Sequence, residues 1–103
     1  MNLDQAKEAV KSVIIKATEN EINIHDDMIL IGGEGELDSV KLVEVCLALE
    51  DVAEENGFEF DWTSESVMSR SKSIFRNITA LSKEFAKQSE VKKFFQSLKK
   101  IDN

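Results

Sequence analysis

The sequence of 103 residues contains no proline, one cysteine and one histidine. These shortages exclude helix breaks at proline, an intramolecular disulfide and a cluster of metal ligands. Without proline, no helical segment is interrupted by a ring that removes a backbone hydrogen bond. Cys46 is the only cysteine, so it can form neither an intramolecular disulfide nor a cysteine metal cluster. A chain without disulfides is compatible with a reducing cytoplasm. His25 has no second histidine or cysteine cluster with which to share a metal, so we expect no metal site and place it in a surface loop.

Long hydrophobic runs are also missing. The longest aliphatic run, from Met28 to Ile31, is too short to cross a membrane, and the amino terminus lacks the basic and apolar regions of a signal peptide. Acidic side chains outnumber basic ones by 20 to 13, for a net charge of −7, which disfavours nucleic acid as a partner. We therefore expect a cytoplasmic, monomeric chain with no transmembrane segment and no nucleic-acid partner.

The charge is unevenly distributed along the chain. Residues 34–65 contain eleven acids and one base, Lys41, whereas residues 70–100 contain nine bases and two acids. This asymmetry favours an acidic docking face for a basic partner in the middle of the chain, although a simply solvated surface is the alternative.

Apolar residues at steps of three and four predict an all-α protein. We expect helices over residues 4–19 and 39–55, a short one within 63–70, and another from Ile74 to about residue 86 with Ser73 as its cap. A long connection over 21–37 separates the first two, residues 58–62 form an extended connection with inward-facing aromatic rings, and residues 71–73 form a turn. The prediction is thus a three-to-four-helix bundle with a long loop between helices 1 and 2.

A further helical stripe contains Val91, Phe94 or Phe95, Leu98 and Ile101. The step of six residues from Phe85 to Val91 rotates the apolar face by roughly 120°, so either the helix breaks near residues 88–89 or one long helix changes its buried face. We divide the chain into a domain over 1–88 and an amphipathic extension over 89–103. The extension is expected to pack on the same domain, and the alternative is that it binds a partner or an anionic membrane surface.

The segment from residue 32 to residue 50 contains the pattern that is most informative about function. Three of the four glycines stand at 32, 33 and 35 and make a flexible approach to the second helix. Asp38 is a good N-cap, and Ser39 then stands at the first turn with its hydroxyl exposed. A phosphate attached to Ser39 would face backbone N–H groups and the positive end of the helix dipole, a favourable place for an anion.

Asp38-Ser39-Val40, preceded by Gly-Glu-Gly-Glu-Leu and followed by a helix ending in Ala-Leu-Glu, resembles the acyl carrier protein family. The resemblance covers residues 3–86. It implies an acyl-carrier-like bundle without catalysis of its own, in which the serine of an Asp-Ser-Leu motif carries a 4′-phosphopantetheine arm delivered from coenzyme A. Two departures are Val40 in place of leucine and Lys41 where the family often has a polar or acidic residue.

The resemblance also implies roles for individual residues. Ser39 would carry the arm, Asp38 would help a phosphopantetheinyl transferase to recognise the site, and acyl-transferring and acyl-modifying enzymes would bring basic docking patches. The implied docking face consists of Val40, Lys41, Glu44, Leu47, Glu50 and Asp51. The implied interior for an acyl chain consists of Val43, Cys46, Leu49 and Phe58.

The expected function is therefore to hold acyl intermediates as thioesters for fatty-acid, polyketide or specialised lipid biosynthesis. Lys41, Trp62 and the extension favour a specialised carrier. Two alternatives stay open at this point. One is an aminoacyl carrier, such as a D-alanyl or peptidyl carrier protein. The other is a helical adaptor with no prosthetic group, in which Ser39 only begins a helix, because aspartate and serine at a helix start also serve capping.

Overall fold

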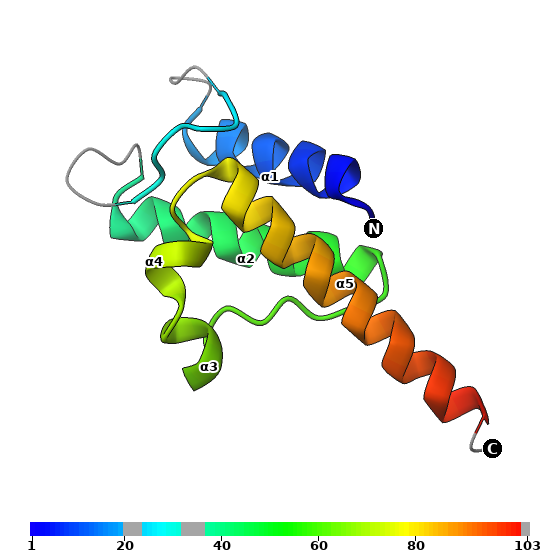
Figure 1. The fold of residues 1–103 in the computed structure, drawn as a ribbon. Coiled ribbons are helices and arrows are strands. Elements are labelled where there is room, and N and C mark those ends of the chain that lie inside the picture. Colours follow the sequence, from blue (N-terminus) through cyan, green and yellow to red (C-terminus); the bar gives the residue numbers. More distant parts are fainter. Residues whose placement is uncertain (20–23, 32–36, 102–103) are drawn as a thin grey trace.

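The computed structural model describes residues 1–19, 24–31 and 37–101, and from residue 91 onward only the course of the backbone. Five helices occur in these ranges: α1 (Leu3–Ala17), α2 (Ser39–Glu55), α3 (Glu65–Met68), α4 (Ser71–Ile74) and α5 (Ile78–Ile101). Helix α1 packs against both α2 and α5, and these three helices form the body of the protein (Figure 1). The described residues contain no strand beyond one isolated bridge between Ile29 and Asn77. The predicted all-α class and the long connection between the first two helices are confirmed.

Helix α1 begins with a capping box. The Asn2 side chain accepts the Gln5 N–H at 2.8 Å, and the Gln5 side chain accepts the Asn2 N–H at 3.0 Å. Two orphan donors of the first turn are thereby satisfied. The helix ends at Thr18, and Glu19 follows in a left-handed conformation with φ of 56°. Residues 20–23, which follow, lie outside the described residues.

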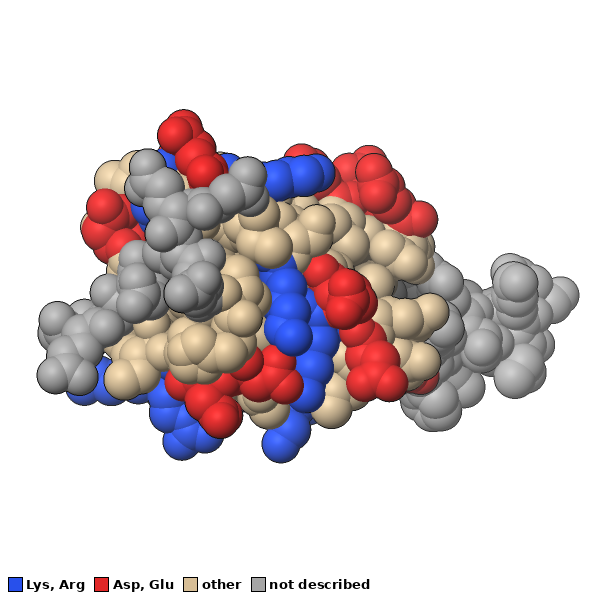
Figure 2. All heavy atoms as spheres, turned by 90° about the horizontal axis from the view of Figure 1, so that it is seen from above, with Lys and Arg blue, Asp and Glu red and all other residues tan. Residues whose placement is uncertain are grey.

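The described part of the α1–α2 connection is tied to the body. The Asp26 carboxylate forms salt bridges with Lys7 at 3.0 Å and with Lys11 at 2.9 Å. The Asp26 backbone carbonyl accepts the Thr79 N–H at 3.2 Å. Figure 2 shows that basic and acidic side chains lie next to each other on this face. The glycine-rich approach over residues 32–36 lies outside the described residues.

Between α2 and α3 the chain is extended and aromatic, as predicted. Gly57 turns the chain with φ of 80°, a conformation that suits glycine. Phe58 and Phe60 are buried against Phe85 of α5, with ring centroids 5.2 and 5.1 Å apart. These rings join the connection to the core that α1, α2 and α5 enclose.

The start of the last helix differs from the prediction. The expected turn over residues 71–73 is the helix α4, and α5 begins at Ile78 rather than Ile74. The helix is capped by Asn77 rather than by Ser73, since the Asn77 side chain accepts the Ala80 N–H at 2.8 Å. The reason is tertiary: Leu30 donates its N–H to Arg76 O at 3.1 Å, which draws this segment out of a helix. Ile74 and Ile78 remain buried on either side of the interruption, so their spacing resembled one continuous helix.

Helix α5 runs without a break across the proposed boundary at residues 88–89. Ser89 is buried, and its hydroxyl donates within the helix to Ala86 O at 2.7 Å. Of the two alternatives, the structure therefore has one long helix. In Figure 1 its last turns continue past the body of the protein.

Candidate functional site at the start of α2

Asp38 caps α2 and leaves Ser39 at its first position. The Asp38 backbone is extended, its Oδ1 accepts the Lys41 N–H at 2.8 Å, and its carbonyl accepts the Leu42 N–H at 2.9 Å. Ser39 is exposed, and its hydroxyl makes no hydrogen bond to any residue that the structure describes. The predicted N-cap and exposed serine are both present.

The surroundings of Ser39 favour a negative group. The N–H groups of Ser39 and Val40 precede the first intrahelical hydrogen bonds, so they are open to an external acceptor. Helix α2 has 17 residues, which aligns enough peptide dipoles to give its start a partial positive charge. An anion esterified to the Ser39 hydroxyl would therefore lie beside unsatisfied backbone donors.

An exposed apolar stripe runs along α2 from this point. Val40 is 65% exposed, Val43 is 42% exposed and Leu47 is 49% exposed. Steps of three and four residues place the three side chains on one face of the helix. Large apolar side chains gathered on one surface strip are typical of an interaction site.

Val43 was expected in the interior, and that expectation is wrong. It shares a face with Val40 and Leu47, whereas Cys46 and Leu49 point into the core. The nearly continuous apolar sequence suggested deep packing all around α2. The helix instead buries one side only, and the composition of an apolar run does not say which side is covered.

The remaining residues of the implied docking face also lie on the outside of α2. Glu44, Glu50 and Asp51 are exposed, and Lys41 is half-buried. Lys41 Nζ lies 3.5 Å from a Glu44 carboxylate oxygen, so the single base of this segment is partly neutralised by its neighbour. The stripe is thus flanked by carboxylates that would suit a partner carrying basic side chains.

Three members of the implied acyl interior are buried together in the core: Cys46, Leu49 and Phe58. Burial, with a smaller contribution from the Glu50 charge, raises the pKa of the Cys46 thiol to about 12. The thiol is therefore protonated at neutral pH and is not a nucleophile. The burial of Cys46 agrees with the interior position that the resemblance implies.

The sequence did not reveal an open acidic cleft beyond the carboxyl-terminal half of α2. It has a volume of about 730 Å³. Its lining combines two buried rings with carboxylates: Glu50, Asp51, Glu54, Phe58, Glu59, Phe60, Asp61 and Thr63. The alternation of Phe58 and Phe60 with Glu59 and Asp61 was visible in the sequence, but an extended chain points successive side chains to opposite sides, so the alternation did not indicate a cleft lined by both kinds. One of the lining residues, Glu50, accepts the Trp62 indole N–H at 3.0 Å.

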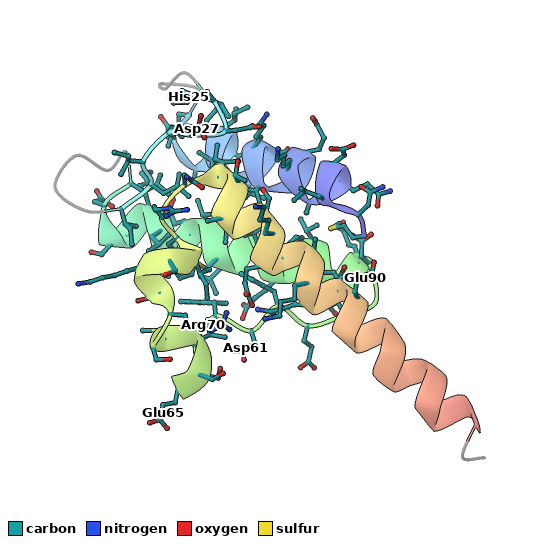
Figure 3. The ribbon with its side chains drawn as sticks, viewed as in Figure 1. His25, Asp27, Asp61, Glu65, Arg70 and Glu90 are labelled. Atoms are coloured by element: carbon teal, nitrogen blue, oxygen red, sulfur yellow. The ribbon has the colours of Figure 1, made fainter. Side chains whose placement is uncertain are left out.

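A polar network that the sequence also did not reveal fixes the connection to α5. Gln88 Oε1 accepts the Asp61 N–H at 2.6 Å, and Gln88 Nε2 donates to Asp61 O and to Glu84 Oε2, each at 2.8 Å. The other Glu84 oxygen accepts Arg70 Nη1 at 3.2 Å. Figure 3 shows Asp61 and Arg70 near each other below α5. Only the Glu84–Gln88 spacing of four was visible in the sequence, since the other partners come from distant positions.

Two kinds of site are absent from the described residues, a metal centre and a membrane-spanning helix. His25 lies in the α1–α2 connection near Asp27 (Figure 3), and no group of His, Cys, Asp or Glu side chains in the described ranges is arranged to hold a metal ion. Over the same ranges, none of the helices combines the length and apolar character needed to cross a bilayer. Comparisons with protein-family models, curated proteins and solved structures found no match.

Proposed function

We propose that this chain is an acyl carrier protein, in which Ser39 bears a 4′-phosphopantetheine arm. The observation that carries the proposal is the start of α2, where an exposed serine follows the Asp38 cap and heads an exposed apolar stripe. Such a position offers a hydroxyl to an incoming transferase without any unfolding. The helix start then accommodates the phosphodiester that forms.

The residues of this chain have distinct roles in the proposed function. Ser39 provides the ester oxygen, and Asp38 holds the first turn by its 2.8 Å hydrogen bond to the Lys41 N–H. The attached arm would supply a thiol that holds an acyl group as a thioester. The protein would contribute attachment, presentation and recognition, so no catalytic residue is required of it.

Recognition would occur along the stripe of Val40, Val43 and Leu47. Its apolar atoms supply area that a partner can bury, and the exposed carboxylates of Glu44 and Asp51 suit basic side chains on that partner. We propose that the transferase and the acyl-transferring enzymes use this one surface. Sharing it would ensure that only one enzyme at a time reaches the arm.

The test is the intact mass of the purified chain after incubation with coenzyme A and a broad-specificity phosphopantetheinyl transferase. The proposal predicts the gain of one phosphopantetheine group, and none for Ser39→Ala. Ser66→Ala is the matched control, because Ser66 is also exposed but lies in α3. If the wild-type chain gains nothing, the adaptor alternative is favoured, with the stripe on α2 as a binding surface and Ser39 as a helix-start residue.

A further inference from the structure

Helix α5 extends beyond the part of the protein against which it packs (Figure 1). Its first half packs within the protein, where Phe85 and Ser89 are buried and the Ser89 hydroxyl lies 3.3 Å from Met1 O. Beyond that point Figure 1 shows the last turns leaving the body, at the end of the molecule opposite to the start of α2. Helix α5 as a whole makes its main helix contacts with α1 and α4. Residues 91–101 therefore lie beyond the body of the protein, and their role has to be sought in their own sequence.

The sequence of this segment has a strict helical register. At about 100° per residue, positions 91, 94, 95, 98 and 101 fall within an arc of about 120°. These five positions are occupied by Val91, Phe94, Phe95, Leu98 and Ile101. Four lysines occupy positions on the remaining arc: Lys92, Lys93, Lys99 and Lys100. One third of the helix circumference is thus entirely apolar, and the rest is basic or polar.

The segment also reverses the charge of the chain. Residues 1–90 contain 19 acids and nine bases, a net charge of −10, whereas residues 91–103 contain four bases and one acid, a net charge of +3; the two add to the −7 of the whole chain. An anionic surface would repel the bundle but attract this end. The attraction is concentrated next to the apolar face.

We propose that residues 91–101 bind the surface of an anionic lipid bilayer, with the helix lying in the interface. Phenylalanine, leucine and isoleucine on one face and lysine on the other are typical of helices that insert into the headgroup boundary. Lysine stems can lie along the apolar region while their ammonium groups reach the lipid phosphates. This inference concerns the far end of the molecule and does not depend on the proposed function of Ser39.

The geometry gives the proposal a consequence for the rest of the chain. The start of α2 and the end of α5 lie at opposite ends of a molecule whose long dimension is 50 Å (Figure 1). A chain held by residues 91–101 would keep Ser39 away from the lipid headgroups. Binding to the membrane and access to Ser39 should therefore be independent.

The experiment is co-sedimentation of the full chain with vesicles of phosphatidylcholine alone or mixed with phosphatidylglycerol. We expect binding to the anionic vesicles that weakens with salt, and at least tenfold weaker binding to the neutral ones. The double variant Lys92→Gln/Lys93→Gln should bind about 25-fold more weakly, because each surface lysine contributes roughly fivefold. The matched control is Lys83→Gln/Lys87→Gln, which removes two bases from the part of α5 that lies in the bundle and should bind as the wild type does.

A third variant tests the apolar face. Phe94→Glu should abolish binding to the anionic vesicles while far-ultraviolet circular dichroism and the melting temperature of the bundle stay close to those of the wild type. The proposal is wrong if the wild type does not bind, if neutral vesicles bind equally well, or if the 83/87 control loses as much affinity as the 92/93 variant. A dimer in sedimentation equilibrium together with no vesicle binding would also overturn it, and would assign the face to a second copy of the chain.

Discussion

Gln88 offers a sharp test of what holds the aromatic connection against α5. Its side-chain amide accepts the Asp61 N–H at 2.6 Å and donates to Asp61 O and to Glu84 Oε2, each at 2.8 Å. One side chain thus joins the segment between α2 and α3 to helix α5, and the two joined residues, Asp61 and Gln88, are 27 positions apart in the chain. Gln88→Ala removes all three bonds and leaves the helix intact, since alanine is a good helix former.

The cost of Gln88→Ala can be worked out from the partners it leaves behind. Asp61 is exposed, so water can replace both lost backbone bonds, which together contribute about 1 kcal/mol. Glu84 is different, because its side chain is only 8% exposed and Arg70 becomes its one remaining partner among the described residues. Losing a hydrogen bond to a buried carboxylate costs about 1.5–2 kcal/mol. The sum of about 3 kcal/mol corresponds to a fall in melting temperature of roughly 12 °C in a domain of this size.

The assay is thermal and urea unfolding followed by circular dichroism, with Lys87→Ala as the control because Lys87 is the exposed neighbour on the same helix. Gln88→Glu adds a second arm. It places a carboxylate against Glu84, so it should be more destabilising than Gln88→Ala at pH 7 and less so near pH 4, where protonation restores a donor. A fall in melting temperature of less than about 3 °C for Gln88→Ala, similar to that of the control, would refute the reasoning.

Three further predictions follow from the described geometry. Since burial raises the pKa of the Cys46 thiol to about 12, a thiol reagent at neutral pH should label the folded chain no faster than it unfolds; fast labelling would show that α2 is oriented differently. Hydrogen bonds from Ser64 lower the pKa of Asp61 below its value of 3.8 in the unfolded chain, so its stabilisation is present above about pH 4 and is lost as the pH falls through the folded value. Asp61→Asn should therefore lower the free energy of unfolding at pH 7, and this loss should shrink as the pH falls below 3.8; a loss that stays the same at every acidic pH tested would contradict this. Lys41→Glu breaks the 3.5 Å pair with Glu44, which should change stability by less than about 1 kcal/mol. It should also raise kcat/KM with enzymes of a general fatty-acid system and lower it with the cognate enzyme, most clearly at low salt; no change in either pairing would leave Lys41 a solvated side chain.

Local signals in the sequence predicted the parts of the structure that depend on local chemistry. The extent of α2, its Asp38 cap and the exposed Ser39 follow from capping preference and helical period. The predicted first helix differs from α1 by one residue at its start and two at its end. Boundaries of this kind are set by the nearest few residues, which a single sequence displays directly.

The features that were not predicted depend on contacts between distant residues. Ile74 and Ile78 are spaced like one helix, and the interruption between α4 and α5 accompanies contacts with a distant segment, such as the hydrogen bond from Leu30 to Arg76 O. Val43 lies in an apolar run whose covered side is set by where α1 packs, so its exposure could not be read from composition. The network of Gln88 joins positions far apart in the chain, and the packing of side chains beyond residue 90 stays a prediction.

The central claim is that Ser39 alone among the ten serines of the chain accepts the phosphopantetheine arm. The most direct measurement is fragmentation mass spectrometry of the wild-type chain after loading by the transferase, which locates the added group on a single residue. The account predicts complete assignment to the fragment that contains Asp38-Ser39-Val40, with the other serines unmodified. A loaded chain whose added group lies on any other residue, or a chain that is not loaded at all, would contradict it.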